Sequence, residues 1–396
     1  MRQLAILGST GSIGRQTLSV VDVLTGRFGV VALAAGNNLD ELVLQIERYR
    51  PELVSVSDGQ KADELAARLR EKGTAPWPAI HHGREGMLAV GTHSSADLVV
   101  SAAVGVVGLE ATYEAVKLGK VIALSNKEVL VAAGEIMIAA AHKAGKELLP
   151  VDSEHNAVHQ CLRGGRHSEV RKLVLTASGG PFRKTPIHKL AEVTVEQALA
   201  HPNWKMGHRI TVDSATMMNK GFEVIEARWL FDMKPAQVDV VIHAQSTVHS
   251  MVEFVDGSVL AQLGATDMRM PIQYALTYPE RVASNQVDLD WAKLKRLDFE
   301  KVSTRRYPCL RLAREAMKKG GAWPCALNAA DEVAVAAFLE RRISFLAIAE
   351  VVESVLARTP RVRMEKMDDV LAADAEARRI AKEEVHRLAN KAVAVS

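Results

Sequence analysis

The stretch Leu4-Ala-Ile-Leu-Gly8-Ser-Thr-Gly11-Ser-Ile-Gly14 decides the fold of this chain. Its apolar first half has the length of a buried strand, and its three glycines are spaced so that a helix can begin directly after them. Glycines allow a pyrophosphate to approach the backbone, and a helix N-terminus supplies oriented N–H groups. A tight strand-to-helix turn is the plainer interpretation, but the position of the motif on the first strand favours a nucleotide site.

The same alternation of short apolar runs and helical patterns continues through the first 150 residues. Buried strands are expected at residues 4–8, 30–36, 53–58, 97–103, 121–125 and 147–151. Because helical stretches lie between most of these strands, the pattern predicts an α/β domain with a doubly wound, mostly parallel sheet. The second strand ends at Gly36-Asn37-Asn38, where an NAD site usually carries an acidic residue. No acidic residue follows until Asp40, which favours NADP, although no Arg or Lys lies there either.

Beyond residue 151 the pattern changes to a mixture of strands and helices. Strands are expected at residues 172–178, 238–245, 249–255 and 258–263, and Asp256-Gly257 between the last two is a strong hairpin signal. Helices are expected to begin near Ser153, at Thr185-Pro186, at Thr194 and near Ser214. These elements predict an α+β domain with a mixed sheet, one face of which we expect to dimerise.

The C-terminal part of the chain is expected to be a charged linker followed by a small helical bundle. Gly320-Gly321 is placed to end one helix, and Asn328, Ser344 and Asp374 are placed to cap three others. The predicted plan is a nucleotide-binding domain at 1–151, a catalytic and dimerisation domain at 152–278, a linker at 279–306 and a bundle at 307–396.

Composition argues against several classes of protein. Lys plus Arg number 50 and Asp plus Glu number 47, so the net charge of +3 gives no support for nucleic-acid binding. Three scattered cysteines without a CxxC pair argue against disulfides and structural zinc, and they fit a reducing cytoplasm. No apolar run reaches the roughly 20 residues that a bilayer span needs, and no signal peptide is expected.

Asn126-Lys127-Glu128 follows directly after a predicted strand of the first domain. The carboxyl ends of parallel strands open onto the ligand crevice, so Lys127 is placed to bind substrate and Glu128 to accept from a ribose. A helix that starts with Asn126 as its cap explains the same triplet.

Asp152-Ser153-Glu154 follows the last strand of the first domain, and in extended backbone its two carboxylates point the same way. Such carboxylates need a shared cation or proton, and oxygen ligands suit Mg²⁺ or Mn²⁺. A cap on the following helix explains the triplet equally well. His155 and His159 have the spacing of a zinc pair but no supporting ligands, so we expect core histidines.

The stretch from Asp213 to Phe231 is apolar on almost every side, which is typical of a buried helix. Asn219, Lys220 and Glu223 share one of its faces because they are three and four residues apart. An ion pair between Lys220 and Glu223 is the simple interpretation. Burial favours a third partner, such as a metal or phosphate, because enclosed charges need partners.

Two loops carry weaker signals. Ser178-Gly-Gly-Pro181 follows a strand and could cradle a phosphate, although a plain turn is favoured. The segment 201–207 is aperiodic and contains Trp204 and Met206, where a solvated loop should be polar. A lid over a substrate and a loop packed on its own domain explain it equally well.

With these segments in order, the chain closely resembles the 1-deoxy-D-xylulose-5-phosphate reductoisomerase family over essentially its full length. The resembling segments lie at 8–14, 126–128, 150–156, 178–182, 201–204, 213–221 and 327–332. The resemblance implies an NADPH-dependent oxidoreductase that rearranges a phosphorylated ketose to a branched aldehyde and reduces it. The implied product is 2-C-methyl-D-erythritol 4-phosphate, a precursor in the non-mevalonate isoprenoid pathway.

The resemblance also implies site residues, a divalent metal (Mg²⁺, Mn²⁺ or Co²⁺) and a homodimer through the central domain. The implied metal ligands are Asp152, Glu154 and Glu223. The implied substrate contacts are Lys127, Ser153, Glu154, Ser178, His201, Ser214, Asn219, Lys220 and Glu223. The implied NADPH contacts are Thr10, Gly11, Ser12, Ile13, Gly36, Asn37, Asn38, Asn126, Glu128, Gly207 and Met268. Trp204 and Met206 would form a lid, and the implied catalytic set is Lys127, Glu154, His201 and His249.

Two other functions fit the same residues. A semialdehyde or homoserine-type dehydrogenase with NADP would share the architecture but would not need three metal carboxylates. A nucleotide-sensing protein would bind NADPH without turnover. Many members of the resembling family carry a basic residue where this chain has Asn37, which is a departure from their pattern.

Overall fold

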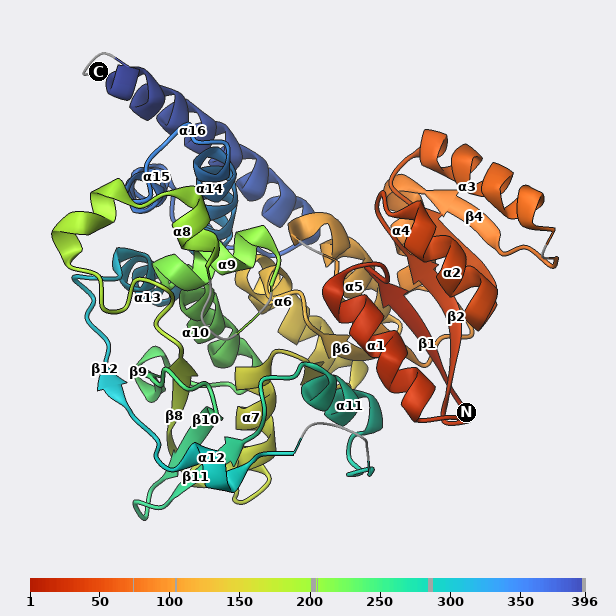
Figure 1. Cartoon of the computed structure of the whole chain (residues 1–396), viewed down its shortest axis with the longest axis horizontal. Helices are drawn as coiled ribbons and strands as arrows, with labels where there is room; N and C mark the ends of the chain where they lie inside the picture. The colour runs from red at the N-terminus through yellow and green to blue at the C-terminus, as the bar shows by residue number, and fades with distance from the viewer. Residues whose placement is uncertain (74, 104, 201–203, 205, 284–287, 394–396) are drawn as a thin grey trace. The chain divides into compact units, whose positions relative to one another are not determined.

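The computed structural model of the chain describes residues 1–73, 75–103, 105–200, 204, 206–283 and 288–393. The chain forms two compact units, whose elements are labelled in Figure 1. The first consists of Met1–Val129, Met137–Asn156 and Asp267–Val287, and the second of Leu130–Ile136, Ala157–Thr266 and Asp288–Ser396. In the described ranges, no helix has both the length and the apolar character that a membrane span requires.

The first unit is built on a seven-stranded parallel sheet, as the alternation of strands and helices predicts. Its spatial order is β4-β3-β2-β1-β5-β6-β7. The strands are β1 (Arg2–Leu7), β2 (Phe28–Ala34), β3 (Leu53–Val56), β4 (Ala79–His82), β5 (Leu98–Ser101), β6 (Val121–Leu124) and β7 (Leu148–Pro150). Because β1 pairs with β2 on one side and β5 on the other, the strand order reverses at β1, where ligand crevices form. The prediction of six strands missed β4, a largely exposed edge strand without an apolar run.

The helices of this unit connect and cover the strands. They are α1 (Ser12–Val23), α2 (Leu39–Tyr49), α3 (Gly59–Lys72), α4 (Gly83–Gly91), α5 (Leu109–Lys117), the ends of α6 (Glu128–Ala144), and α11 (Arg269–Thr277), with the 3-10 helix η1 (Gly105–Gly108). Leu18 of α1 and Ile272 of α11 share one buried core with Ile6 of β1. A segment more than 250 residues away in the sequence therefore completes the first domain's core.

The second unit contains a mixed sheet, as predicted, but with five strands where four were expected, because the short strand β12 lies in the stretch taken for a linker. Its order is β11-β10-β8-β9-β12, in which β8 and β9 are parallel and the other pairs are antiparallel. The strands are β8 (Val170–Ala177), β9 (Val238–Ile242), β10 (Val248–Phe254), β11 (Val259–Leu263) and β12 (Glu300–Lys301). The predicted hairpin at Asp256-Gly257 joins β10 to β11, and Gly257 adopts the left-handed φ of 88° that such a turn favours.

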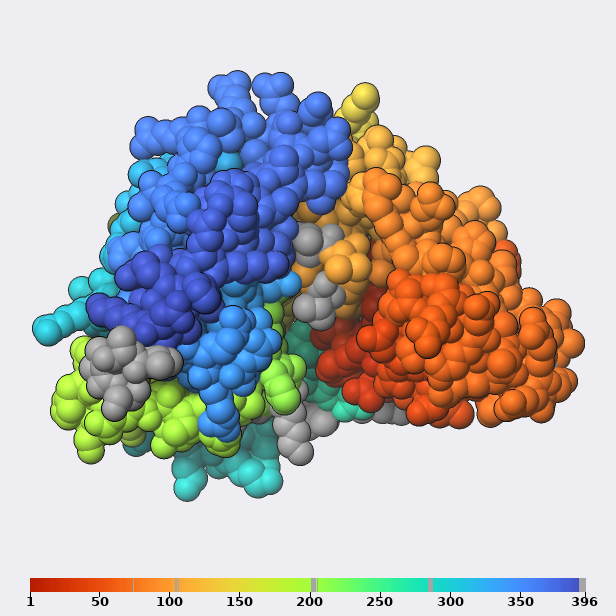
Figure 2. Space-filling model, turned by 90° about the horizontal axis from the view of Figure 1, so that it is seen from above, coloured from red at the N-terminus to blue at the C-terminus, as the bar shows by residue number. Residues whose placement is uncertain are grey.

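Helices surround this sheet and form the C-terminal bundle, whose residues make one continuous blue surface in Figure 2. They are most of α7 (Ser153–Leu162), then α8 (Val195–Leu199), α9 (His208–Thr216), α10 (Met218–Leu230), α12 (Trp291–Leu294), α13 (Pro308–Lys319), α14 (Ala322–Leu339), α15 (Ala347–Arg358) and α16 (Met367–Val393). Three 3-10 helices, η2 (His167–Glu169), η3 (Ile187–Glu192) and η4 (Pro235–Gln237), join them. Phe222 of α10 is buried in one core with Ala313 of α13 and Leu327 of α14.

The predicted helix start near Ser214 is wrong. Ser214 lies near the end of α9, and α10 begins four residues later at Met218. Met217 separates the two helices with a left-handed φ of 63°, a conformation that costs a side chain energy and that packing must enforce. Met217 is itself buried, so the surrounding core supplies that packing.

Helix caps were predicted with mixed success. Thr194 caps α8 and forms the predicted capping box with Gln197. Asn328 and Asp374 are not caps, because they lie inside the continuous helices α14 and α16. Ser344 accepts from the Ala347 amide at 3.4 Å, close to the start of α15. Asn328 instead accepts from Arg209 of α9, and Asp374 accepts from Arg378 one turn further along α16.

Gly14 tests how tightly the first loop packs on α1. A Cβ at Gly14 would overlap backbone atoms of Gly8 and Ser9, which cannot move aside as a side chain can. We expect Gly14→Ala to lower the free energy of unfolding by roughly 1–3 kcal/mol, measured by urea denaturation. Gly36→Ala is the control, because no atom lies within 4 Å of a Cβ built there. Equal stability of the two variants would contradict the packing described.

Candidate active site

The glycine loop forms the carboxyl end of β1. Gly8 has a φ of 88° and lies against the backbone of Ala102, so a side chain would not fit. Gly11 is the N-cap residue of α1 and has no side chain to accept from the first turn, which leaves the helix N-terminus suited to an anion. Gln45 of α2, which the sequence reasoning missed, donates to the Ser9 carbonyl at 3.0 Å and fixes the loop. The predicted nucleotide contacts in this loop and first turn are Thr10, Gly11, Ser12 and Ile13.

The end of β2 presents three exposed residues beside that loop. Asn38 caps α2 by accepting from the Glu41 amide at 3.2 Å. The Asn37 side-chain oxygen accepts from the Ser57 hydroxyl at 2.7 Å. A Cβ at Gly36 would meet open space. Asn38 therefore has a structural task, while Asn37 faces the end of β3.

Asn126-Lys127-Glu128 lies at the end of β6, as predicted, and all three residues are buried. The Asn126 side chain donates to the Gly105 carbonyl at 2.8 Å and accepts from the Glu128 amide at 3.1 Å. Asn126 therefore accepts from the first amide of α6, as its interpretation as a helix cap requires. Lys127 Nζ donates to Asp152 Oδ2 at 3.0 Å, which links the triplet to the next strand end.

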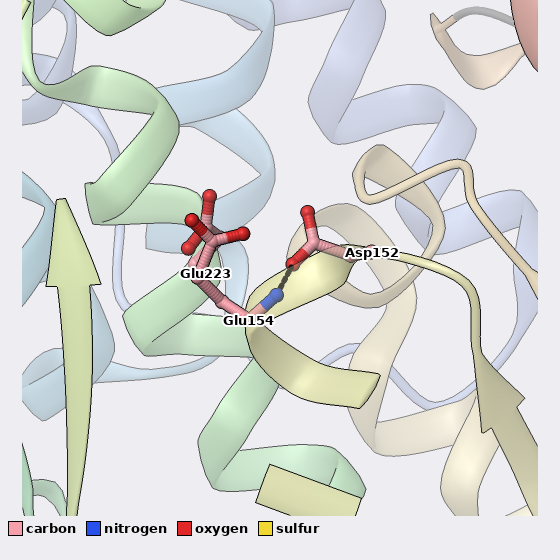
Figure 3. A group of neighbouring side chains, drawn as sticks. All are labelled: Asp152, Glu154 and Glu223. Atoms are coloured by element: carbon pink, nitrogen blue, oxygen red, sulfur yellow. Dashed lines mark hydrogen bonds between the residues drawn. The ribbon is translucent and has the colours of Figure 1, made fainter. Parts of the chain in front are cut away.

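Three carboxylates converge at the start of α7 and on α10. One oxygen each of Asp152, Glu154 and Glu223 lies within 4.8 Å of the others, and Figure 3 shows Asp152 facing the adjacent side chains of Glu154 and Glu223. Asp152 Oδ1 also accepts from the Glu154 amide at 3.1 Å and the His155 amide at 3.3 Å, which caps α7. The two interpretations of the sequence, a cap and a metal ligand, are therefore compatible in one side chain.

The polar face predicted on the apolar helix is present in α10. Lys220 is 3% exposed and Glu223 is fully buried. Lys220 Nζ donates to one oxygen of Glu223, and Asn219 donates to the other at 2.5 Å. The simple ion pair thus exists, and it orients a buried carboxylate toward Asp152 and Glu154.

This donor set fits a hard divalent cation. All three groups offer oxygen, which Mg²⁺ and Mn²⁺ prefer. Like charges this close are unfavourable without a positive charge among them. Among the described residues, Lys127 pairs with Asp152 and Lys220 with Glu223, and a cation among the three carboxylates would offset the repulsion that remains. His155 and His159 are buried, and His155 Nδ1 lies 3.3 Å from Asp152 Oδ1.

Ser178 and Ser214 are brought together by a glycine turn after β8. Gly179 and Gly180 have left-handed φ angles of 81° and 66°, and the Gly180 amide donates to Ser178 Oγ at 3.2 Å. A Cβ at Gly180 would strike the backbone of Ser214 and Ala215, so the turn lies directly against α9. The plain turn favoured from sequence is real, and it places two hydroxyl-bearing residues at one location.

The remaining predicted residues are more scattered. Ser153 donates to Glu154 Oε2 at 2.7 Å. His249 is buried in β10, and Met268 precedes α11 and packs on the core of the first unit. Gly207 is the N-cap residue of α9, and Trp204 and Met206 are half-buried. His201 lies outside the described residues.

Family models match the chain along most of its length. A model described as 1-deoxy-D-xylulose 5-phosphate reductoisomerase matches residues 4–134. A model of the C-terminal domain of that enzyme matches residues 148–231, and one described as DXP reductoisomerase C-terminal domain matches residues 263–380. The three models cover the strand ends and helices that carry the site.

Relatives and solved structures agree with these models. The 1-deoxy-D-xylulose 5-phosphate reductoisomerase of Solibacter usitatus is 52% identical over 97% of each chain. That of Chlorobium chlorochromatii is 51% identical over 96% of this chain and 99% of its own. A DOX-P reductoisomerase crystallised with NADPH, fosmidomycin and magnesium has a TM-score of 0.93 and 39% identity, covering 98% of both chains. The Zymomonas mobilis enzyme in complex with NADPH has a TM-score of 0.90 and 42% identity, covering 97% of this chain and 99% of that one.

The carboxylate cluster predicts metal binding that depends on Glu223. We expect the chain to bind one Mn²⁺ per protomer and Glu223→Gln to weaken that binding about tenfold or more, because one of three anionic ligands is lost. Titration of Mn²⁺ followed by electron paramagnetic resonance measures both. Glu226→Gln, one turn further along α10 and outside the cluster, is the control. Equal Mn²⁺ affinity in all three proteins would contradict the assignment.

Proposed function

The chain belongs to the 1-deoxy-D-xylulose 5-phosphate reductoisomerase family, and we propose that the carboxylate cluster is the centre of its active site. The enzyme uses NADPH and a divalent metal to convert 1-deoxy-D-xylulose 5-phosphate to 2-C-methyl-D-erythritol 4-phosphate. The single observation that supports the siting is the convergence of Asp152, Glu154 and Glu223, because this reaction needs a polarised carbonyl and a deprotonated hydroxyl on neighbouring carbons.

Asp152, Glu154 and Glu223 would hold the divalent cation. When bound there, the metal polarises the substrate carbonyl and lowers the pKa of the neighbouring hydroxyl. Lys220 and Asn219 keep Glu223 in position through hydrogen bonds to both of its oxygens. Buried surroundings strengthen every charge interaction in such a site because water is excluded.

Ser178, Ser214, Asn219 and Lys220 would bind the phosphate and hydroxyls of the substrate. The contact between the Gly180 turn and the α9 backbone supports this assignment, since it brings the residues Ser178 and Ser214 close together. Lys127 and Ser153 would contact the substrate from the side of Asp152, and His201 and His249 complete the proposed set. Fixing the phosphate would hold the reacting carbons in place, which converts binding energy into rate.

The glycine loop would bind the pyrophosphate of NADPH. Gly11 at the start of α1 and the exposed Gly36 support this, because both leave room for the cofactor to approach the backbone. The further proposed contacts are Thr10, Ser12, Ile13, Asn37, Asn38, Asn126, Glu128, Gly207 and Met268. Trp204 and Met206 would belong to a lid that excludes water from the aldehyde.

The proposed organisation has an NADPH-binding domain at 1–151, a catalytic and dimerisation domain at 152–278, a linker at 279–306 and a bundle at 307–396. We propose a cytoplasmic homodimer formed through the central sheet. Its support is the edge strand β11, where Val259 and Leu260 are 50% and 40% exposed. Apolar side chains on an unpaired sheet edge favour association with another chain.

One experiment separates the proposed function from its alternatives. We expect NADPH absorbance to fall when 1-deoxy-D-xylulose 5-phosphate and Mg²⁺ or Mn²⁺ are added, and EDTA to stop the reaction. A simple dehydrogenase would not depend on the metal, and a sensing protein would bind NADPH without consuming it. No metal-dependent NADPH oxidation would refute the proposal.

The division of tasks along the chain gives a second test. Glu223→Gln should reduce kcat by at least about 100-fold, since metal-centred polarisation contributes several kcal/mol. NADPH affinity, measured by quenching of protein fluorescence, should change by less than about threefold because cofactor binding rests on other residues. A large loss of NADPH affinity would mean that α10 serves the nucleotide instead.

A further inference from the structure

Arg209 in the first turn of α9 connects that helix to α14 of the bundle. Its Nη2 donates to the Asn328 side-chain oxygen at 3.1 Å and lies 3.8 Å from Asp331 Oδ2. Its Nε lies 3.7 Å from Asp213 Oδ2, and its Nη1 lies 3.5 Å from Glu332 Oε2. One guanidinium therefore faces carboxyl groups from both helices.

Among the residues that the structure describes, carboxyl groups outnumber guanidinium groups in this cluster. Arg378 of α16 is its second guanidinium, and it donates to Glu332 at 2.7 Å and to Asp374 at 2.6 Å. Two guanidinium groups thus lie beside four described carboxyl groups, those of Asp213, Asp331, Glu332 and Asp374. Cys309 of α13 also faces Asp331, and burial raises its pKa, so it carries no charge. A proton on one carboxyl group would relieve the imbalance.

Asp331 is the group best suited to hold that proton. It is fully buried, and among the described residues no N–H or O–H group donates to either of its oxygens, whereas the Asp213 carboxyl group lies within hydrogen-bonding reach. Burial, followed by the nearby Asp213 carboxylate, raises the pKa of Asp331 well above its usual value. Asp331 therefore keeps its proton at pH values that ionise an exposed aspartate, and its O–H can be directed at Asp213.

The position of α9 matters because of the residue after Asp213. Ser214 follows it directly, and the Gly180 turn that carries Ser178 lies against the Ser214 backbone. A shift of α9 relative to α14 would therefore alter the packing of Ser214 against this turn. The cluster thus holds the helix that carries one of the two serines proposed to bind phosphate.

We propose that Asp331 is a positioning residue, which as a neutral acid hydrogen-bonds to Asp213 and, with Arg209, locks α9 so that Ser214 meets Ser178. The proposal deepens the proposed function, because it assumes that Ser214 binds the substrate phosphate. It explains why a carboxyl group is retained in the interior of α14, where an apolar residue would cost no desolvation.

Two substitutions separate hydrogen bonding from mere volume. Asp331→Asn keeps a neutral donor of nearly the same shape, whereas Asp331→Ala removes it and leaves Asp213 facing a void. We expect Asp331→Ala to raise KM for 1-deoxy-D-xylulose 5-phosphate about tenfold, with kcat changed less than about threefold. Asp331→Asn should stay within about twofold of the native enzyme in both constants. Glu384→Gln, at a buried acid of α16 that pairs with Arg387 outside this cluster, is the matched control and should leave KM unchanged.

Hydrogen exchange of α9 tests the lock without any assumption about substrate. In the protein without substrate, amides of residues 208–216 should exchange faster in Asp331→Ala than in the native protein, and at the native rate in Asp331→Asn. Faster exchange in Asp331→Ala with an unchanged KM would support the positioning of α9 by Asp331. It would refute the role of Ser214 in binding the substrate phosphate. Unchanged exchange in Asp331→Ala, or equal acceleration in both variants, would overturn the proposal.

Melting temperatures measured at several pH values test the protonation of Asp331 separately. Because its folded pKa is raised above its unfolded value of about 3.9, the stability that the neutral acid provides is full below that value and declines as the pH rises toward the folded pKa. Asp331→Asn cannot ionise. The melting temperature of this variant minus that of the native protein should therefore increase as the pH rises from 5 to 8. A difference that does not vary with pH would show an ionised Asp331 and refute the neutral acid.

Discussion

The mutual repulsion of three carboxylates at one location is the constraint on which the site depends. Asp152, Glu154 and Glu223 approach within 4.8 Å, and Glu223 does so with no exposure to solvent. Burying a carboxylate costs far more than isolated hydrogen bonds return, so lysines and an asparagine offset that cost, as would the divalent cation that we propose at this site. That requirement explains the buried Lys220 and the ion pair between Lys127 and Asp152. It also explains why α10 is apolar elsewhere, since water would weaken each of these interactions.

Glu223 and Asp331 are two buried carboxyl groups of the second unit whose surroundings differ. At Glu223, the Lys220 ammonium and the Asn219 amide from the preceding turn of the same helix each donate to one carboxylate oxygen. At Asp331, the only close guanidinium among the described residues is shared with other carboxyl groups, and burial favours the protonated acid. The same residue class is thus a candidate ligand in one place and a hydrogen-bond donor in the other. The partners decide which form exists, as pKa arguments require.

Local patterns in the sequence predicted the fold well wherever local physics decides it. The glycines at 8, 11 and 14 and the alternating apolar runs predicted the parallel sheet, because turns and burial leave marks in a few consecutive residues. β4 escaped because an exposed edge strand needs no apolar run. The break between α9 and α10 at Met217 was not predicted, because only tertiary packing holds a methionine at a φ of 63°. The convergence of residues 152, 154 and 223 was implied by family resemblance, and the Arg209 cluster was not foreseen because its members are about 120 residues apart.

Asp152 carries two tasks through one short side chain. One of its oxygens accepts from two backbone amides at the start of α7, and the other accepts from Lys127. Glutamate would keep the charge but reach past the amides, and asparagine would keep the cap but lose the charge. Neither of these two substitutions therefore preserves both the helix cap and the negative charge. A substitution at this position would therefore disturb the start of α7 and the carboxylate cluster together.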